Sequence, residues 1–307
     1  MLNFLFSFDS NYEIQGSVAI YSLLENVKEK INIFVIVDNS TKLFKLPAKV
    51  TSHKNLHDLK YKLIEPSDIF YNTEQAHISK ATFYRLYLSS LFENENFNLI
   101  YLDADIVCVQ DPTKELTSAI REMKINNQNA AFADELYRNQ YEDPFTRLGM
   151  SSDKYFNAGV MIINLAKWKE NEYSTKSIKL IETLKEKAKY WDQDVLNSLF
   201  DGNYLSLDNN LNYRTGYAEQ KIPIEKKIFI HFSGKSKPWD VGGIFEEFAE
   251  LYHYYYKNLY RREYHVTTRN RKNAILKLYR NRKYFGLLNY KKLLKYIIIS
   301  ISSIIKK

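Results

Sequence analysis

The sequence has little of what builds a disulfide framework or a membrane span. It contains a single cysteine, Cys108, which excludes an internal disulfide and indicates a reducing compartment. No stretch reaches the roughly 18 apolar residues that a membrane span needs. The first residues, MLNFLFSFDSNY, have no positively charged segment and soon turn polar. We therefore expect a first strand there rather than a secretory signal.

Several catalytic signatures are also missing from the sequence. There is no P-loop, no GxGxxG, no CxxC and no Ser, His and Asp order typical of a hydrolase. A hydrolase triad or a redox site therefore has no specific support. The nine glycines and six prolines are scattered, and neither a linker rich in them nor an internal repeat is present. One α/β domain followed by a helical tail is the simplest organisation.

Charge is unevenly distributed along the chain, whose formal net charge is +8. Residues 258–307 hold 14 lysines and arginines against one acid, which leaves 30 basic and 35 acidic side chains in residues 1–257. An acidic body with a basic tail differs from a globally basic nucleic-acid-binding protein. We therefore expect no nucleic acid partner.

Short apolar runs and helical spacings alternate along the acidic body. Residues 2–8 and 32–37 are predicted strands, and residues 17–30 between them carry apolar side chains at a helical spacing. This order predicts a βαβ unit with a parallel sheet, so the predicted fold class is α/β. The other predicted strands are 98–102, 159–165 and 227–232, and the other predicted helices are 79–92, 174–189 and 191–200.

Two aspartates, Asp103 and Asp105, follow the predicted strand 98–102. Like charges this close resist joint ionisation, and burial of either is costly without compensation. Ligands of parallel α/β sheets collect at the carboxyl ends of strands. A divalent cation at this edge would offset the repulsion and keep positions open for diphosphate oxygens. A solvated acidic turn is the alternative.

His231 lies inside a predicted strand and is followed by the sequence FSGKSKPW. A histidine can complete a mixed nitrogen and oxygen ligand set for Mn²⁺. Gly234 lets the backbone approach a phosphate, and Lys237 supplies a compact positive charge. The alternative is a core histidine followed by a surface turn.

Three further segments carry polar side chains that suit a nucleotide or a sugar. The segment FDSNY follows the first strand, and its side chains can bind the edge and the face of a base. The segment YFNAGV offers an amide beside a strand, and WDQD places two acids and an amide at a helix start. The structural alternative is a polar turn for FDSNY, and it is stabilisation of acids by the helix dipole for WDQD.

Six motifs in this order resemble family 8 of the glycosyltransferases, which includes bacterial lipopolysaccharide and lipooligosaccharide galactosyl- and glucosyltransferases. The shared motifs are FDSNY, SKATFYRLYL, YLDAD, YFNAGVMIINL, WDQDVLN and HFSGKSKPW. They run from Asp9 to Trp239, and six motifs in the right order are far more specific than any one of them.

The resemblance implies a GT-A fold, with a Rossmann-like mixed sheet flanked by helices, in a catalytic domain of residues 1–257. It also implies retaining transfer of a hexose, galactose or glucose, from a UDP-sugar to a cell-surface glycan or glycolipid, with Mn²⁺ or Mg²⁺ as cofactor. The implied metal ligands are Asp103, Asp105 and His231. The other implied donor-binding residues are Asp9, Asn11 and Tyr12 for uridine, Gly234 and Lys237 for the diphosphate, and Arg85, Ala104, Asp134, Asn157, Ala158, Asp192 and Gln193 around the sugar and the metal.

The resemblance assigns the catalytic positions to Gln193 and Asp192, with the Gln193 side chain beneath the anomeric carbon. An amide is a poor nucleophile, and Asp194, one residue further along the predicted helix, should point elsewhere. We therefore expect attack from the side of the leaving group, with the UDP phosphate accepting the proton. The two-carboxylate scheme of retaining glycosidases does not apply.

Basic and apolar side chains interleave in the tail, residues 258–307, which contains the ten-residue run YIIISISSII. This pattern predicts an amphipathic helix on an anionic membrane surface. We expect a cytoplasmic protein, peripheral on the inner face of the cell membrane; a helix packed on the catalytic domain is the alternative. The alternative to an enzyme is a non-catalytic UDP-sugar- or glycan-binding protein of the same fold, although the complete Asp, Asp and His set speaks against it.

Overall fold

The computed structural model describes most of the chain. The described residues are 1–38, 44–65, 80–135, 143–216, 222–234, 237–241, 243–244, 246–267, 294, 297–299 and 301. The chain divides into two compact units. The first comprises residues 1–213 and 222–229, and the second comprises residues 214–221 and 230–307.

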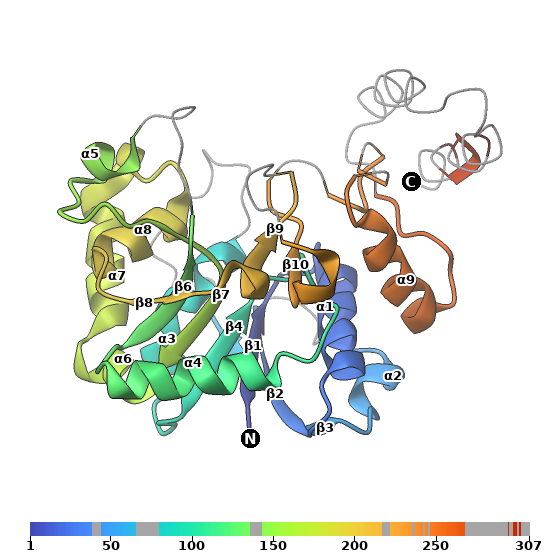
Figure 1. Ribbon diagram of the computed structural model, residues 1–307, viewed down its shortest axis with the longest axis horizontal. Helices are drawn as coiled ribbons and strands as arrows, with labels where there is room; N and C mark the ends of the chain where they lie inside the picture. Colours follow the sequence, from blue (N-terminus) through green and yellow to red (C-terminus); the bar gives the residue numbers. More distant parts are fainter. Residues whose placement is uncertain are drawn as a thin grey trace. The chain divides into compact units, whose positions relative to one another are not determined.

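A seven-stranded sheet, in the order β3-β2-β1-β4-β7-β6-β8, organises the first unit (Figure 1). Its strands are β1 (Asn3–Ser7), β2 (Ile31–Asp38), β3 (Leu56–Ile64), β4 (Asn98–Leu102), β6 (Ala130–Asp134), β7 (Phe156–Asn164) and β8 (Leu205–Leu207). β7 is antiparallel to both β4 and β6, whereas the other pairs are parallel. The sheet is therefore mixed, and the predicted α/β class is confirmed. A smaller sheet has the order β5-β10-β9, from β5 (Ile106–Cys108), β10 (Phe229–His231) and β9 (Tyr213–Arg214).

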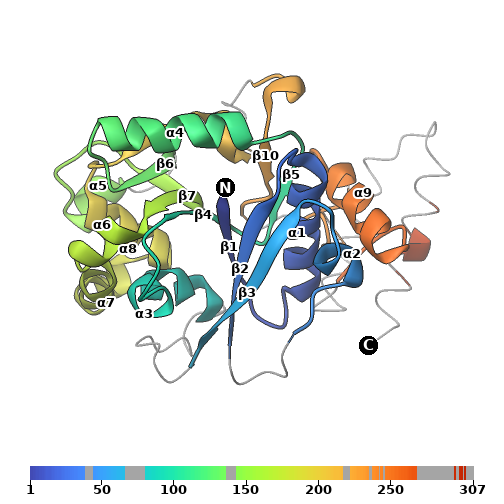
Figure 2. The same cartoon turned by 90° about the horizontal axis from the view of Figure 1, so that it is seen from below.

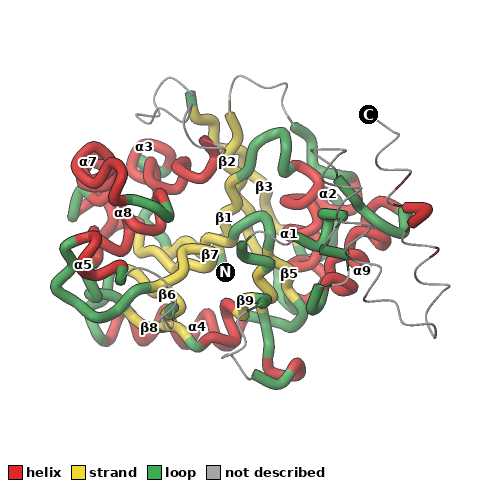
Figure 3. Tube along the Cα trace, turned by 90° about the horizontal axis from the view of Figure 1, so that it is seen from above, coloured by secondary structure: helices red, strands yellow, loops and turns green. Residues whose placement is uncertain are grey.

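Helices cover both faces of the seven-stranded sheet (Figures 2 and 3). One side carries α1 (Glu13–Asn26), α2 (Ala48–Thr51) and α4 (Thr113–Ile125), and the other carries α3 (Leu88–Leu91), α6 (Leu165–Glu170), α7 (Tyr173–Leu184) and α8 (Trp191–Phe200). The remaining helices are α5 (Pro144–Leu148), α9 (Ala249–Tyr260) and 3₁₀ helices at Lys80–Tyr87, Lys185–Lys187, Asn209–Asn212 and Ile224–Lys226.

One buried cluster joins the sheet to the second helical layer. It includes Tyr101 of β4, Phe156 of β7, Tyr84 of the first 3₁₀ helix and Leu196 of α8. Burial of each such side chain stabilises the fold by about 2 kcal/mol. The cluster therefore fixes α8 and the 3₁₀ helix against the strands that carry the candidate site.

Three predicted helices differ from the observed ones, and the one predicted at 174–189 is α7, which ends earlier, at Leu184. The helix predicted at 17–30 is α1, which begins and ends four residues earlier, at Glu13 and Asn26. Its first turn has no apolar periodicity, and Val27 is already extended so that β2 can follow. The helix predicted at 79–92 is mostly 3₁₀, with only Leu88–Leu91 in α geometry. Its β-branched and aromatic residues favour an α-helix weakly, and the predicted cap Ser79 lies outside the described residues.

The predicted tail lies mostly outside the described residues, and the boundary predicted between residues 257 and 258 falls inside α9. In the part of the chain that the structure describes, no helix is long and apolar enough to cross a membrane.

Two buried histidines lie among aromatic rings in the second unit. His253 donates from Nε2 to the carbonyl oxygen of Pro238 at 2.8 Å, and His265 Nδ1 lies 2.7 Å from the Tyr252 hydroxyl. Burial lowers the pKa of His253 to about 4. Burial also lowers the pKa of His265 to about 4, and the charge of His253 adds to this effect.

We expect these histidines to make the folded protein sensitive to acid. Because their folded pKa lies below the ordinary value, the unfolded state binds more protons, so stability is present above about pH 6.5 and is lost as the pH falls toward 4. Each histidine contributes a loss of about 3 kcal/mol by pH 4. Urea denaturation between pH 7.5 and 4.5 should give a shallower pH dependence for His253→Gln than for the wild type. An NMR titration that places the pKa of His253 at 6.5 would contradict this expectation.

Candidate active site

Three strand ends meet at one edge of the seven-stranded sheet. β1 and β4 are adjacent and parallel, so their carboxyl ends lie together. β7 is antiparallel to β4, so its first residues lie at the same edge. The backbone N–H of Asp103 donates to the carbonyl oxygen of Gly159 at 2.9 Å, which holds the Asp103–Asp105 segment against β7.

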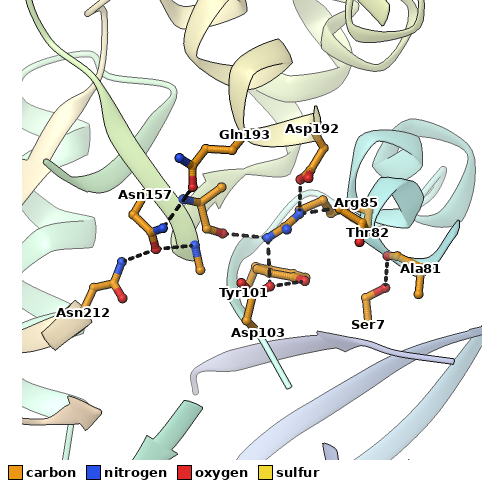
Figure 4. Close-up of polar contacts among 12 residues, drawn as sticks. Ser7, Ala81, Thr82, Arg85, Tyr101, Asp103, Asn157, Asp192, Gln193 and Asn212 are labelled. Atoms are coloured by element: carbon orange, nitrogen blue, oxygen red, sulfur yellow. Dashed lines mark hydrogen bonds and ion pairs between the residues drawn. The ribbon is translucent and has the colours of Figure 1, made fainter. Parts of the chain in front are cut away.

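Arg85, buried in the 3₁₀ helix, connects two of the predicted acids (Figure 4). Its Nη1 donates to Asp103 Oδ1 at 3.0 Å and to the carbonyl oxygen of Ala158 at 2.7 Å. Its Nε lies 2.5 Å from Oδ2 of Asp192, which is only 2% exposed. The Tyr101 hydroxyl donates to the same Asp103 oxygen at 2.8 Å. One guanidinium therefore compensates two carboxylates.

The charges of this cluster depend on one another. Burial alone would lower the pKa of Arg85, but the carboxylates of Asp103 and Asp192 outweigh burial and raise it above its ordinary value. Burial raises the pKa of Asp192 to about 6; Arg85 opposes this rise and the charge of Asp103 adds to it. Asp192 is thus ionised at neutral pH largely because Arg85 lies beside it.

The Gln193 amide makes four hydrogen bonds. Its Oε1 accepts from Asn157 Nδ2 at 2.9 Å and from the backbone N–H of Ala158 at 3.2 Å (Figure 4). Its Nε2 donates to Glu135 Oε2 and to the Tyr155 hydroxyl, both at 3.1 Å. Two donors and two acceptor positions are all that an amide offers. The side chain is therefore held in one orientation at the start of α8.

Two more predicted residues are held by side chains from the residue before β8 and from the 3₁₀ helix before β9. Asn157 Oδ1 accepts from Asn212 Nδ2 at 2.9 Å (Figure 4). Asp134, at the end of β6, accepts from the Tyr204 hydroxyl at 2.6 Å. The pairing register between β6 and β7 shifts after Phe132, and such an irregularity changes the direction in which the residues at the end of β6 project.

Asp103, Asp105 and His231 form the candidate metal site. β5 begins directly after Asp105 and neighbours β10, which ends at His231. One ligand atom from each residue lies within 4.8 Å of the others. Bonds from a divalent cation to such atoms are about 2.0 to 2.2 Å long, so the spacing is close to that of three ligands on one ion. Carboxylate oxygens with one imidazole are a donor set that suits Mn²⁺, and these residues fit the predicted cofactor.

The predicted uridine residues lie in the turn between β1 and α1. Asp9 accepts from the backbone N–H of Asn11 at 2.9 Å and from its Nδ2 at 3.3 Å. The backbone N–H of Tyr12 donates to the carbonyl oxygen of Asp9 at 3.0 Å. The turn thus places these three side chains beside the carboxyl end of β1.

The remaining predicted residues lie close in sequence to the candidate metal ligands. Ala104 is buried between the two aspartates. In the second unit, Gly234 has a φ of +84°, a left-handed conformation that favours glycine. Lys237 Nζ donates to the carbonyl oxygen of Phe232 at 2.6 Å, which holds the ammonium near the start of this loop.

Sequence reasoning missed four side chains that bond directly to predicted ones: Glu135, Tyr155, Tyr204 and Asn212. Glu135 follows the carboxyl end of β6 as Asp103 follows β4, so a prediction of β6 would have singled it out. Tyr155 lies in the motif YFNAGV, but nothing in that motif indicates a partner for its hydroxyl. Nothing in the local sequence marks Tyr204 or Asn212.

This mixed sheet, with polar residues gathered at its edge, is the GT-A fold of glycosyltransferases. The structure of the galactosyltransferase LgtC in complex with donor and acceptor sugar analogues matches with a TM-score of 0.71 and 21% identity, over 89% of this chain and 100% of that chain. The glycosyltransferase GlyE of Streptococcus pneumoniae matches with a TM-score of 0.57 and 24% identity, over 83% of this chain and 60% of that chain.

The chain belongs to glycosyl transferase family 8, whose pattern matches residues 3–242. Two lipopolysaccharide 1,2-glucosyltransferases of Escherichia coli are 27% and 25% identical to it. These matches cover 80% and 77% of this chain and 74% and 73% of the relatives. The family and the fold predicted from the six motifs are confirmed.

Proposed function

We propose that the protein is a retaining, metal-dependent hexosyltransferase that moves galactose or glucose from a UDP-sugar to a cell-surface glycan or glycolipid. The convergence of Asp103, Asp105 and His231 carries this proposal, because a nucleotide-sugar donor brings a diphosphate that needs compensating charge. The lipopolysaccharide glucosyltransferases among the relatives support the class of acceptor.

In the proposed donor complex, residues at each strand end bind one part of the UDP-sugar. Asp9, Asn11 and Tyr12 bind uridine, and Gly234 and Lys237 contact the diphosphate. The sugar lies among the group Arg85, Asp134, Asn157, Ala158, Asp192 and Gln193. Asp103, Asp105 and His231 would hold a divalent cation, which would supply positive charge to the leaving diphosphate when bound.

The proposed transfer needs no protein nucleophile. Gln193 presents an amide, which is a poor nucleophile. Asp194 is 0% exposed and its carboxylate accepts from Arg147 and Tyr155, so it is occupied within the core. The acceptor oxygen therefore attacks from the face that UDP leaves, and the departing phosphate oxygen takes its proton. Gln193 and Asp192 orient the sugar during this step.

Gln193→Ala tests the role of the amide. Because the side chain orients the sugar but forms no bond to it, we expect kcat to fall by about 100-fold with residual turnover. Donor affinity, measured by calorimetry with UDP-sugar and Mn²⁺, should change little. Loss of all turnover with intact donor binding would instead indicate a nucleophilic role.

A screen of UDP-sugars tests the proposed function directly. The full chain is incubated with UDP-galactose, UDP-glucose and other UDP-hexoses, and UDP release is measured with Mn²⁺, with Mg²⁺ and with chelator. We expect release from one donor that depends on the cation and increases with a sugar acceptor. Binding of UDP-sugar without release under every condition would favour the non-catalytic alternative.

We propose further that residues 258–307 attach the catalytic domain, residues 1–257, to the inner face of the cell membrane. The 14 basic residues and the run YIIISISSII support this proposal. Deletion of residues 261–307 should release the protein from vesicles that contain anionic lipid while activity on a soluble acceptor is kept. The proposal fails if the shortened chain still sediments with these vesicles.

A further inference from the structure

Asp194 is the centre of a buried cluster in the first unit. Its Oδ2 accepts from Arg147 Nη1 at 2.7 Å and its Oδ1 accepts from Nη2 at 3.1 Å, so the ion pair is bidentate. The Tyr155 hydroxyl donates to Oδ1 at 2.6 Å, and the backbone N–H of Tyr190 donates to Oδ2 at 2.8 Å. Asp194 is 0% exposed and Tyr155 is 2% exposed. The three side chains come from α5, the residue before β7, and α8.

The same cluster leads to the Gln193 amide through one hydroxyl. An ionised carboxylate only accepts hydrogen bonds, so the Tyr155 proton points toward Asp194. The lone pairs of the Tyr155 oxygen then face Gln193 and can only accept from Nε2. Asp194 therefore determines which end of the Gln193 amide lies beside Tyr155.

The other end of the amide meets a second fixed donor. The backbone N–H of Ala158 can only donate, and it lies 3.2 Å from Gln193 Oε1. A flipped amide would bring its NH₂ group against this N–H and leave its oxygen beside the Glu135 carboxylate. Both ends therefore require the same orientation.

We propose that Tyr155, Asp194 and Arg147 are positioning residues that hold the Gln193 amide with Oε1 toward β7 and Nε2 toward Glu135. This proposal rests on the proposed function, in which Gln193 orients the donor sugar. Asp194 acts through Tyr155, and Arg147 holds the Asp194 carboxylate in place through two hydrogen bonds. The three side chains contribute to the rate of transfer without contact with the donor.

Tyr155→Phe is the first test, because it keeps the buried ring and removes only the hydroxyl. We expect kcat for the donor found in the screen to fall by about 10- to 100-fold, with KM for this donor within about twofold. Tyr173→Phe is the matched control: Tyr173 lies in the same buried cluster, but its hydroxyl accepts from Asn129. This control should keep the wild-type kcat.

A double-mutant cycle separates positioning from general support of the fold. If Tyr155 acts through Gln193, Tyr155→Phe should cause no further loss of kcat in the Gln193→Ala background. Asp194→Asn, which can turn an NH₂ group toward Tyr155, should reproduce the loss in the wild-type background and not in Gln193→Ala. Equal losses in both backgrounds, or a wild-type kcat in Tyr155→Phe, would overturn the proposal.

NMR spectroscopy tests the orientation of the Gln193 amide without a measurement of turnover. The side-chain NH₂ resonances of Gln193, assigned by their loss in Gln193→Ala, should shift in Tyr155→Phe and Asp194→Asn and stay unchanged in Tyr173→Phe. Unshifted resonances would refute the positioning role even in an active enzyme. Shifted resonances in a chain that releases no UDP from any donor would uphold the orientation and contradict the proposed function.

Discussion

Asp105→Asn should lower cation-dependent turnover by about 1,000-fold, because charge stabilisation by a bound cation amounts to several kcal/mol in the transition state. The variant keeps the shape of the side chain but weakens one of the three candidate ligands. UDP release at saturating donor and Mn²⁺, together with calorimetric titration of Mn²⁺, measures both consequences. Higher Mn²⁺ concentrations should restore part of the rate.

Two controls make this result specific. Asp58→Asn removes a partly exposed acid on β3 that pairs with Lys60, and it should leave turnover unchanged. Asp103→Asn should also lower turnover, but it additionally weakens the contacts with Arg85 and Tyr101 and so should lower stability. Unchanged affinity for Mn²⁺ in Asp105→Asn would contradict the metal site.

Arg85→Met should lower the free energy of unfolding by about 3 to 5 kcal/mol, the range found when one partner of a buried ion pair is removed. The variant leaves Asp192 buried beside Asp103 without the guanidinium that they share. Urea denaturation at pH 8 measures the loss. Arg85→Lys should keep part of the stability because it retains the charge but not the two-sided geometry.

The pH dependence of the Arg85→Met defect follows from Asp192. Burial already raises the pKa of Asp192 to about 6 with Arg85 present, and the pKa should rise further without it. A carboxyl group with a raised folded pKa contributes stability at low pH that is lost as the pH rises through that pKa. The loss of unfolding free energy in Arg85→Met should therefore be smaller at pH 5 than at pH 8. A second substitution, Asp192→Asn, should restore part of this loss at pH 8. An equal defect at both pH values would contradict this account.

β1, β2 and β4, the strand before Asp103, could be predicted from sequence because they are short, apolar and mostly buried. β3 could not, since it lies at the sheet edge, its polar and apolar residues do not alternate strictly, and most of them are partly or fully exposed. β6, with the sequence AAFAD, was missed because alanine is uncommon in strands. Without β6, neither Glu135 nor the relation of Asp134 to Tyr204 could be anticipated.

Some contacts of the candidate site could likewise be predicted from sequence, and others could not. The expectation that Asp103 and Asp105 lie at the carboxyl edge of the sheet follows from parallel pairing alone. The contact of Arg85 with Asp103 and Asp192 does not, because it depends on how a 3₁₀ helix packs against α8. The expectation that His231 joins the two aspartates came from the family resemblance, since no spacing rule relates residues so far apart in sequence.

Where β7 pairs with β4, the candidate site is built partly from main-chain atoms and partly from side-chain atoms. The N–H of Asp103, the carbonyl of Gly159, and the N–H and carbonyl of Ala158 belong to the main chain, so substitutions of side chains leave them in place. Asp134 and Asn157 contribute side-chain atoms to the same site. Under the proposed function, a new donor preference could therefore evolve through a few side chains, while the scaffold that aligns the reacting groups is inherited unchanged.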